Sequence, residues 1–421
     1  MYWDKLIIVA ALACIFQEGL CQGSLVIRAA RVFDGAAMHS GWTVIVEGDH
    51  ITFAGPSATA KIPKEAIVRD YPNGTLLPGL IEGHAHMLLH PYNETPWDEQ
   101  VLKESDALRV ARATIHARKT LEAGFTTVRD LGSEGAGYAD VALKQAIDEG
   151  IIPGPRLLVS GRAIVATGSY GPKGFDDDFE VMLGAEAADG NDLIRVTRDQ
   201  IGKGADLVKV YADYRWGRND TAMPTFSIEE LKLVVETAKS SGRPVVAHAV
   251  TVEAMTRAVN AGIETIEHGD YGDETIFALM KSRGVALCPT LAAGDAISQY
   301  KGWKPGSTPE PERIRIKRES FRKALASGVT ICAGGDVGVF AHGDNVRELE
   351  LMAQYGMKPI EVLRSVTSTN SRVFHVDDHV GTIAPNKLAD LVVVEGDPSQ
   401  SIAQLRSVLV VFKGGAEVTR K

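Results

Sequence analysis

Five residues of metal-binding type lie at the ends of short apolar runs in this sequence. His84 and His86 are one residue apart, so on a strand both imidazoles point to the same face and can chelate one ion. His248 and His268 each end an apolar run, and Asp336 follows another. A single strand-end histidine is more often structural, but five such residues on one face indicate a metal centre.

Lys209 is the sixth candidate ligand, and it lies inside the apolar run 206–211. Strand alternation places Leu207, Lys209 and Tyr211 on the interior face. An unpaired ammonium in that position is unfavourable, because the charge loses its hydration. Either a neighbouring carboxylate neutralises it, or reaction with CO₂ converts the lysine into an anionic oxygen donor that can bridge two cations. We favour the second hypothesis because of the surrounding histidines.

These residues require a scaffold that brings many strand ends together. Eight short apolar runs alternate with segments of helical periodicity. The runs cover residues 76–81, 126–131, 156–160, 206–211, 244–248, 264–268, 285–289 and 329–333. Helices are predicted at 105–122, 138–149, 192–203, 228–240, 252–260, 274–282 and 313–326. This alternation predicts an α/β fold, a TIM (β/α)8 barrel, with its active site at the carboxyl ends of the strands.

The two ends of the chain resemble each other more than they resemble the middle. Both consist of short β-like runs separated by Gly, Asn and Asp turns. We therefore predict a small β-sandwich domain built from residues 24–80 and 376–421, with a metal-dependent barrel domain at 81–375 between them.

The first 23 residues have the features of a secretory signal. Lys5 precedes the apolar run 6–16, and small residues occur at 19–23. The run is too short to span a bilayer, so no membrane span is expected. Cleavage would place the protein in the periplasm or outside the cell, and an uncleaved segment would leave it in the cytoplasm. The net charge of −9 argues against nucleic acid as a partner.

Four motifs connect these residues to a known family. They are Leu77-Pro-Gly-Leu-Ile-Glu-Gly-His-Ala-His86, Ala123-Gly-Phe-Thr-Thr-Val-Arg-Asp130, Ile266-Glu-His-Gly269 and Ala389-Asp-Leu-Val-Val-Val394. With them the sequence resembles the amidohydrolase superfamily, and it is most similar to the imidazolonepropionase-like and metal-dependent prolidase-like branch. The resemblance implies two divalent metal ions, expected to be zinc. It also implies the ligand sets: His84, His86 and Asp336 for one ion, His248 and His268 for the other, and carboxylated Lys209 bridging both.

The expected reaction is hydrolysis of a C–N bond by a hydroxide that bridges the two metal ions. Asp336 would carry the proton to the leaving nitrogen, and His248 or Tyr211 would stabilise the oxyanion. Candidate substrate residues just beyond the strand ends are Tyr170, Tyr211, Tyr214, Arg215 and His342. Arg215 is the candidate for a substrate carboxylate. Tyr170 stands where prolidase-like relatives often carry a histidine, which leaves the substrate open.

Several functions remain open at this stage. The substrate is a small amide or a dipeptide, and the enzyme is a dipeptidase or an N-acyl amino acid hydrolase. An imidazolonepropionase-like cyclic amidase or a mononuclear deaminase is the alternative enzyme, and one metal per chain with unmodified Lys209 would favour the deaminase. A binding protein that has lost catalysis is a further alternative. A homo-oligomer is the assembly considered.

Overall fold

The computed structural model describes residues 23–419, except 177 and 308. Apart from Gly23, the predicted signal segment lies outside the described residues. None of the described helices is long and apolar enough to cross a membrane.

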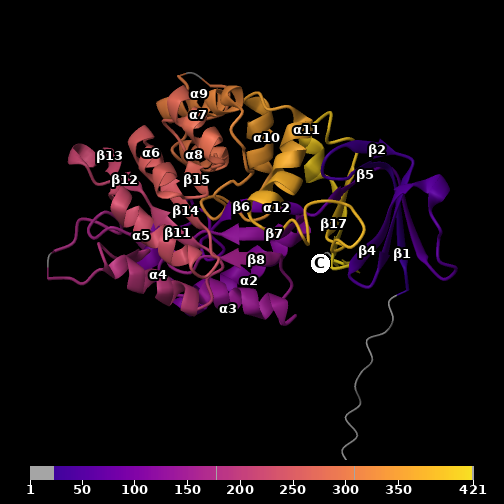
Figure 1. Ribbon diagram of the computed structural model, residues 1–421, viewed down its shortest axis with the longest axis horizontal. Coiled ribbons are helices and arrows are strands. Elements are labelled where there is room, and N and C mark those ends of the chain that lie inside the picture. Colours follow the sequence, from indigo (N-terminus) through magenta and orange to yellow (C-terminus); the bar gives the residue numbers. More distant parts are fainter. Residues whose placement is uncertain (1–22, 177, 308, 420–421) are drawn as a thin grey trace, which may run out of the picture.

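The two ends of the chain together form one mixed eight-stranded sheet (Figure 1). Its strands are β1 (Leu25–Phe33), β2 (Met38–Ser40), β3 (Trp42–Glu47), β4 (His50–Pro56), β5 (Ile67–Pro78), β17 (Leu391–Glu395), β18 (Val408–Lys413) and β19 (Ala416–Glu417). The strand order is β19-β18-β17-β5-β1-β3-β4, and β2 pairs with β1. Side chains such as Ile27, Val44 and Leu391 form its own apolar core. The strands form a single hydrogen-bonded sheet, so the two packed sheets expected of a sandwich are not confirmed.

The middle of the chain contains two parallel sheets. One has the order β6-β7-β8 and the other the order β10-β9-β11-β14-β15-β16. Their strands are β6 (Leu80–Ala85), β7 (Phe125–Asp130), β8 (Arg156–Val159), β9 (Ile164–Val165), β10 (Glu186–Ala187), β11 (Val208–Tyr211), β14 (Val245–Ala249), β15 (Thr265–His268) and β16 (Ala286–Cys288). The backbone amide of Asp206 donates to the carbonyl of Val159 at 2.8 Å, which links β8 to the segment before β11.

The eighth barrel strand is the part of the fold prediction that fails. Residues 329–333 form no strand in the described chain, and that side carries only isolated parallel bridges, Leu287 with Ile331 and Ala85 with Val337. Gly334, Gly335 and Gly338 follow this segment, and glycine weakens regular strand pairing. The described strands therefore surround the centre without forming a closed ladder.

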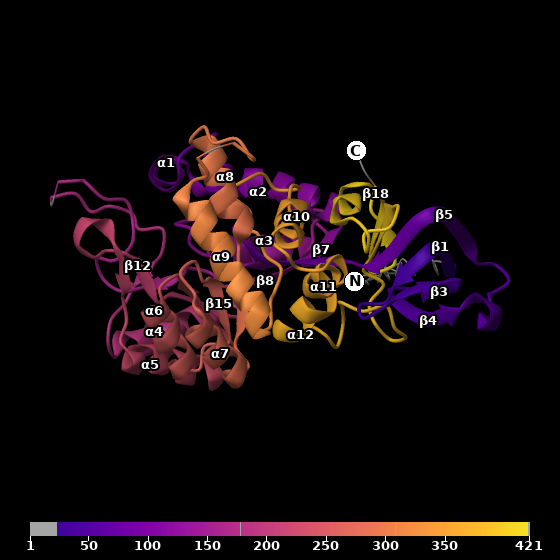
Figure 2. The same cartoon turned by 90° about the horizontal axis from the view of Figure 1, so that it is seen from above.

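Helices cover the outside of the parallel strands (Figures 1 and 2). All seven predicted helices are confirmed to within one residue at each end. They are α2 (Asp106–Glu122), α3 (Ala139–Asp148), α4 (Asp192–Gly202), α5 (Ile228–Lys239), α6 (Val252–Ala261), α7 (Glu274–Arg283) and α9 (Glu312–Ser327). Local capping explains the agreement: the Ser227 and Thr251 side chains accept from backbone amides at helix starts, and Gly262 and Gly284 end helices in the left-handed conformation.

Other elements were not expected from the sequence. They are α1 (Trp97–Lys103), α8 (Leu291–Tyr300), α10 (Val346–Gln354), α11 (Pro359–Arg364), α12 (Asn370–Val373) and the hairpin of β12 (Asp213–Arg215) and β13 (Ala222–Pro224). Helix α8 is largely buried. Both α8 and β12 carry residues that line the candidate site.

The junction between the two parts of the molecule is Gly79. It separates β5 of the terminal sheet from β6 of the parallel strands, so the predicted first barrel strand at 76–81 spans two elements. A Cβ atom on Gly79 would overlap the side chain of Thr126 in β7. The close approach explains why glycine occupies this position, and it aligns β6 so that His84 and His86 reach the carboxyl end of the strands.

Candidate metal centre

The structure brings all six predicted metal ligands together at the carboxyl ends of the parallel strands. Five of them line a cavity of about 760 Å³: His84, His86, His248, His268 and Asp336. The ring centroids of His84 and His268 are 5.1 Å apart, and those of His248 and His268 are 4.5 Å apart. Lys209 lies in β11 and is 1% exposed.

Each histidine has one ring nitrogen close to a protein acceptor. Nδ1 of His84 lies 2.9 Å from Oε2 of Glu267, and Nδ1 of His86 lies 2.9 Å from the carbonyl oxygen of Gly132. Nδ1 of His268 lies 2.7 Å from Oγ1 of Thr290.

His248 differs in orientation, because its Nε2 lies 3.6 Å from Oδ1 of Asp213. The hydrogen-bond partners of His84, His86 and His268 orient these imidazoles and leave the other nitrogen for a cation. The four rings therefore fit a metal site.

Two buried polar atoms in this centre lack hydrogen-bond partners among the described residues. They are Nζ of Lys209 and Oδ1 of Asp336. Oδ1 of Asp336 lies 3.3 Å from Nε2 of His86 and 3.7 Å from Nε2 of His84, and ligand atoms of these three residues fall within 4.8 Å of one another. Buried polar groups normally have partners, so these atoms also fit a divalent cation.

Backbone geometry aims two of the candidate ligands, His268 at the end of β15 and Asp336 in a loop. His268 and Asp336 have φ values of 77° and 63°, in the left-handed region that non-glycine residues rarely adopt. Such strain concentrates at functional sites. A Cβ atom on Gly334 would lie 2.6 Å from the amide nitrogen of His84. Glycine at 334 thus allows the segment carrying Asp336 to approach β6.

Burial and mutual charge set the pKa values in the centre. Burial, with help from Lys209, lowers the pKa of His84 to about 4 and that of His248 to about 3. Burial alone would raise the pKa of Asp336, but the adjacent His84 and His86 hold it below its usual range. Burial lowers the pKa of Lys209. The centre thus favours an ionised carboxylate and neutral imidazoles at 84 and 248, as metal ligation requires. At His86 burial is outweighed by Asp336 and Glu134, which raise its pKa to about 9.

Residues behind the ligands were not identified from the sequence. Glu267 of β15 accepts from Nη2 of Arg129 at 2.8 Å and from Oγ1 of Thr265 at 2.6 Å, which fixes the carboxylate beside His84. Glu82 accepts from the amides of His84 and Gly335, and burial raises its pKa to about 7. Glu267 directly precedes a predicted ligand, but its inward orientation becomes clear only in the assembled sheet.

Four of the five predicted substrate residues line the cavity: Tyr170, Tyr211, Tyr214 and Arg215. The ring of Tyr211 stacks on His248 at 4.7 Å, and its hydroxyl donates to Oε1 of Glu134 at 3.3 Å. That proton points to Glu134, so the expected oxyanion role of Tyr211 finds no support in this geometry. The Arg215 guanidinium carbon lies 5.6 Å from the centroid of the Tyr214 ring.

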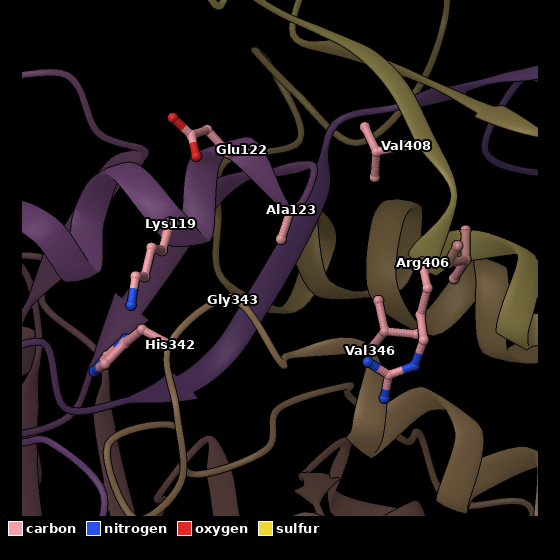
Figure 3. Close-up of a pocket in the computed structure, with 9 residues that line it drawn as sticks. Lys119, Glu122, Ala123, His342, Gly343, Val346, Arg406 and Val408 are labelled. Carbon is pink, nitrogen blue, oxygen red and sulfur yellow. The ribbon is translucent and has the colours of Figure 1, made fainter. Parts of the chain in front are cut away.

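The structure places His342 away from this cavity. It lines a separate pocket with Lys119 and Arg406 (Figure 3). Its ring stacks on His116 at 4.3 Å, and its Nε2 lies 3.1 Å from the carbonyl oxygen of Leu89. The chain after the predicted eighth strand turns away from the cavity after Val339. His342 was predicted as a substrate residue because it follows that strand end, and this turn places it elsewhere.

Further cavity residues come from loops and helices that the sequence did not assign to the site. They include Trp97, Glu134, Asp270, Arg313 and Lys317. Glu134 follows β7, so the rule that identified the other strand-end residues applies equally to it. Arg313 and Lys317 belong to α9, and only the packing of that helix beside α7 and α8 brings them to the cavity.

Comparison with known proteins agrees with this geometry. Residues 75–418 match the model of the amidohydrolase family, a match that includes all six candidate ligands. The chain belongs to the amidohydrolase family. The ochratoxinase of Aspergillus niger is 29% identical over 413 residues, which cover 91% of this amidohydrolase and 83% of the relative.

Solved structures are similar over most of the chain. A Xaa-Pro dipeptidase with bound methionine in its active site has a TM-score of 0.82 and 30% identity, covering 94% of this amidohydrolase and all of the other chain. A prolidase complexed with N-methylphosphonate-L-proline has a TM-score of 0.80 and 26% identity, with coverage of 94% and 100%. This amidohydrolase is therefore a hydrolase of C–N bonds in the prolidase-like branch, with the TIM-barrel architecture of the family.

Proposed function

We propose that this amidohydrolase cleaves the amide bond of a dipeptide or an N-acyl amino acid with the help of two divalent cations, zinc being the expected metal. The observation that carries the proposal is the cluster of four oriented imidazoles around two unpartnered buried atoms, Nζ of Lys209 and Oδ1 of Asp336. The cavity of about 760 Å³ suits a small substrate.

His84, His86 and Asp336 would hold one cation, and His248 and His268 the other. When bound, the cations supply a water molecule of lowered pKa and polarise the substrate carbonyl. Glu267 and Thr290 support this assignment, because each lies at hydrogen-bond distance from one ring nitrogen of His84 or His268 and leaves the other nitrogen for a cation.

Lys209 would bridge the two cations after carboxylation. The neutral amine attacks CO₂, a C–N bond forms, and one proton is released, which leaves an anionic carbamate on Nζ. Burial favours this reaction because it lowers the pKa of Lys209 and so increases the neutral amine. Within the described chain no carboxylate accepts a hydrogen bond from Nζ, which argues against simple neutralisation by an acidic neighbour.

Asp336 is the proposed proton carrier. Its carboxylate is ionised at neutral pH, lines the cavity and has one oxygen without a partner among the described residues. It can accept a proton and deliver it to the leaving nitrogen. His248 remains a ligand in this proposal, because its Nε2 faces Asp213 and its ring stacks on Tyr211.

Arg215 and Arg313 are the proposed contacts of a substrate carboxylate. Both line the cavity, and both are exposed. Arg313 makes no hydrogen bond or ion pair with any described residue, so its guanidinium is available for a bidentate contact.

The terminal segments 24–80 and 376–421 would form a separate domain beside the catalytic domain at 81–375.

The deciding experiment combines metal analysis with a hydrolysis screen. Purified protein should contain two divalent ions per chain and cleave members of a panel of Xaa-Pro dipeptides, Xaa-Arg dipeptides and N-acyl amino acids. Lys209→Ala should lose metal and at least about 100-fold in kcat/KM, and Asp336→Asn should lose activity to a similar degree.

Lys239→Ala is the matched control, because Lys239 lies at the exposed end of α5. Full metal content and full rate in Lys209→Ala would contradict the bridging role. One ion per chain with unmodified Lys209 would favour the mononuclear deaminase. Protein without stoichiometric metal that cleaves nothing in the panel would overturn the proposed function.

A further inference from the structure

Glu134 is a buried carboxylate of the cavity wall that the proposed reaction does not use. Its side chain is 3% exposed. Its backbone has a φ of 49°, a conformation that non-glycine residues adopt rarely and mostly at functional sites. Arg109 fixes this turn by donating to the carbonyl oxygens of Glu134 at 2.7 Å and Ser133 at 3.0 Å. The fold therefore holds the carboxylate in one position.

Three aromatic side chains from separate elements donate to this carboxylate. Nε1 of Trp97, in α1, donates to Oε2 at 2.9 Å. The hydroxyl of Tyr170, in the loop after β9, donates to the same oxygen at 2.7 Å, and the hydroxyl of Tyr211, in β11, donates to Oε1 at 3.3 Å. All four residues line the cavity.

The direction of these hydrogen bonds determines what the patch offers to a ligand. Each phenol has one proton, and both protons point to Glu134, so the oxygens of Tyr170 and Tyr211 retain only acceptor capacity. A carboxylate is also acceptor-only. The patch formed by Glu134, Tyr170 and Tyr211 therefore presents lone pairs and no donor.

Among the described residues, the basic side chain nearest to the Glu134 carboxylate is His86. Among the described residues, no lysine or arginine nitrogen lies within salt-bridge distance of the Glu134 carboxylate. The guanidinium of Arg109 is directed to backbone carbonyls. Nδ1 of His86 is 3.8 Å away and lies nearer to the carbonyl of Gly132, at 2.9 Å. The site thus lacks a lysine or arginine partner, and a ligand could supply a permanent positive charge.

We propose that this patch binds a positively charged amino group of the substrate. An ammonium carries three N–H donors and no acceptor, which complements an acceptor-only patch. The tyrosine and tryptophan rings around it add cation–π attraction. The inference rests on the proposed function and narrows it: the preferred substrates are dipeptides with a free α-amino group, in preference to N-acyl amino acids.

The kinetic test compares alanylproline, N-acetylalanylproline and N-acetyllysylproline as substrates of the metal-loaded enzyme. The wild type should prefer alanylproline to its N-acetyl analogue by about 10- to 100-fold in kcat/KM, the range for a hydrogen bond to a charged group. Glu134→Gln should reduce that preference to near unity, mainly through KM. Recovery of the rate with N-acetyllysylproline would show that the patch accepts a side-chain ammonium as well.

Glu94→Gln is the matched control, because Glu94 precedes α1, is 56% exposed and does not line the cavity. It should keep the wild-type preference. An equal loss of activity on all three substrates in Glu134→Gln, or a wild type that prefers the N-acetyl substrate, would overturn the inference.

A binding measurement separates this inference from the proposed function. Leucinol carries an ammonium at neutral pH and has no amide bond, and 4-methylpentan-1-ol is its analogue without the amine. Calorimetry should show leucinol binding that weakens about tenfold or more in Glu134→Gln, with no such change for the alcohol. If the wild type cleaves no substrate but binds leucinol through Glu134, only the proposed function fails. Equal leucinol affinity in the wild type and Glu134→Gln would overturn the ammonium site.

Discussion

At the scale of single residues, the site depends on the residues that hydrogen-bond to the ligands as much as on the ligands themselves. His268 shows this most simply, because its Nδ1 lies 2.7 Å from Oγ1 of Thr290. Thr290 itself has a φ of 49°, so the loop after β16 is shaped to present that hydroxyl. A hydroxyl in this position orients the ring.

Thr290→Val tests this contact with little change of side-chain volume. The valine removes the hydrogen-bond partner of His268, so metal affinity should fall by about 10- to 100-fold. Competition with a chelator measures the affinity. Thr256→Val in α6, where the hydroxyl only bonds the carbonyl of Val252, is the control. Unchanged metal affinity in Thr290→Val would mean that Thr290 does not orient the ligand.

At the scale of elements, α10 supports α8 through a buried acid. Oε2 of Glu348 accepts from the amide of Ala292 at 2.6 Å, in the first turn of α8, where no side chain of the preceding residue caps the helix. The other oxygen, Oε1, has no partner in the described chain. Burial therefore raises the pKa of Glu348 well above its usual value.

This raised pKa predicts a pH dependence of stability. The folded protein holds the Glu348 proton more tightly than the unfolded chain does. The contribution of Glu348 to the free energy of unfolding is therefore fully present below its unfolded pKa of about 4.3, and it is lost as pH rises through its pKa in the folded protein. In Glu348→Gln, which does not titrate, this loss of stability with rising pH should disappear. The melting temperature of the variant relative to wild type should therefore be higher at pH 8 than at pH 5, and a pH-independent difference would contradict the assignment.

At the scale of the whole molecule, the terminal sheet and the parallel strands share one core. Phe33 and Leu77 of the sheet and Val392 of β17 belong to the same apolar cluster as Phe125 and Val128 of β7. Arg156 also joins the two parts, with Nε and Nη2 donating to the carboxylate of Asp390 at 2.8 Å and 3.1 Å. Strand β5 continues into β6 with only Gly79 between them.

This shared core predicts one cooperative unfolding transition for both parts. Calorimetry of the metal-loaded protein should show a single peak, and far-ultraviolet and tryptophan signals should change together. Leu77→Ala should lower that one transition, at a cost of about 2 to 5 kcal/mol, because it opens a cavity in the common cluster. Two separated transitions, with only one of them shifted, would contradict the prediction.

The amino-acid sequence by itself determined the ligand types, the seven helices and the family resemblance. Helical periodicity and capping residues such as Ser227 are local signals, and His84-Ala-His86 is a local spacing. Each can be recognised without knowing what lies across the fold. The same is true of Lys209, whose apolar neighbours show that it is buried.

Only the tertiary structure decided which residues meet. The role proposed for Glu134 depends on its hydrogen-bond donors Trp97, Tyr170 and Tyr211, which lie on three other parts of the fold. Arg313 reaches the cavity because of the way α9 packs. His342 lies outside the predicted site, because the chain turns away from the cavity before it. Hydrogen bonds and charge interactions act over a few ångströms, and residues far apart in the chain come within that distance only when the strands and helices have assembled.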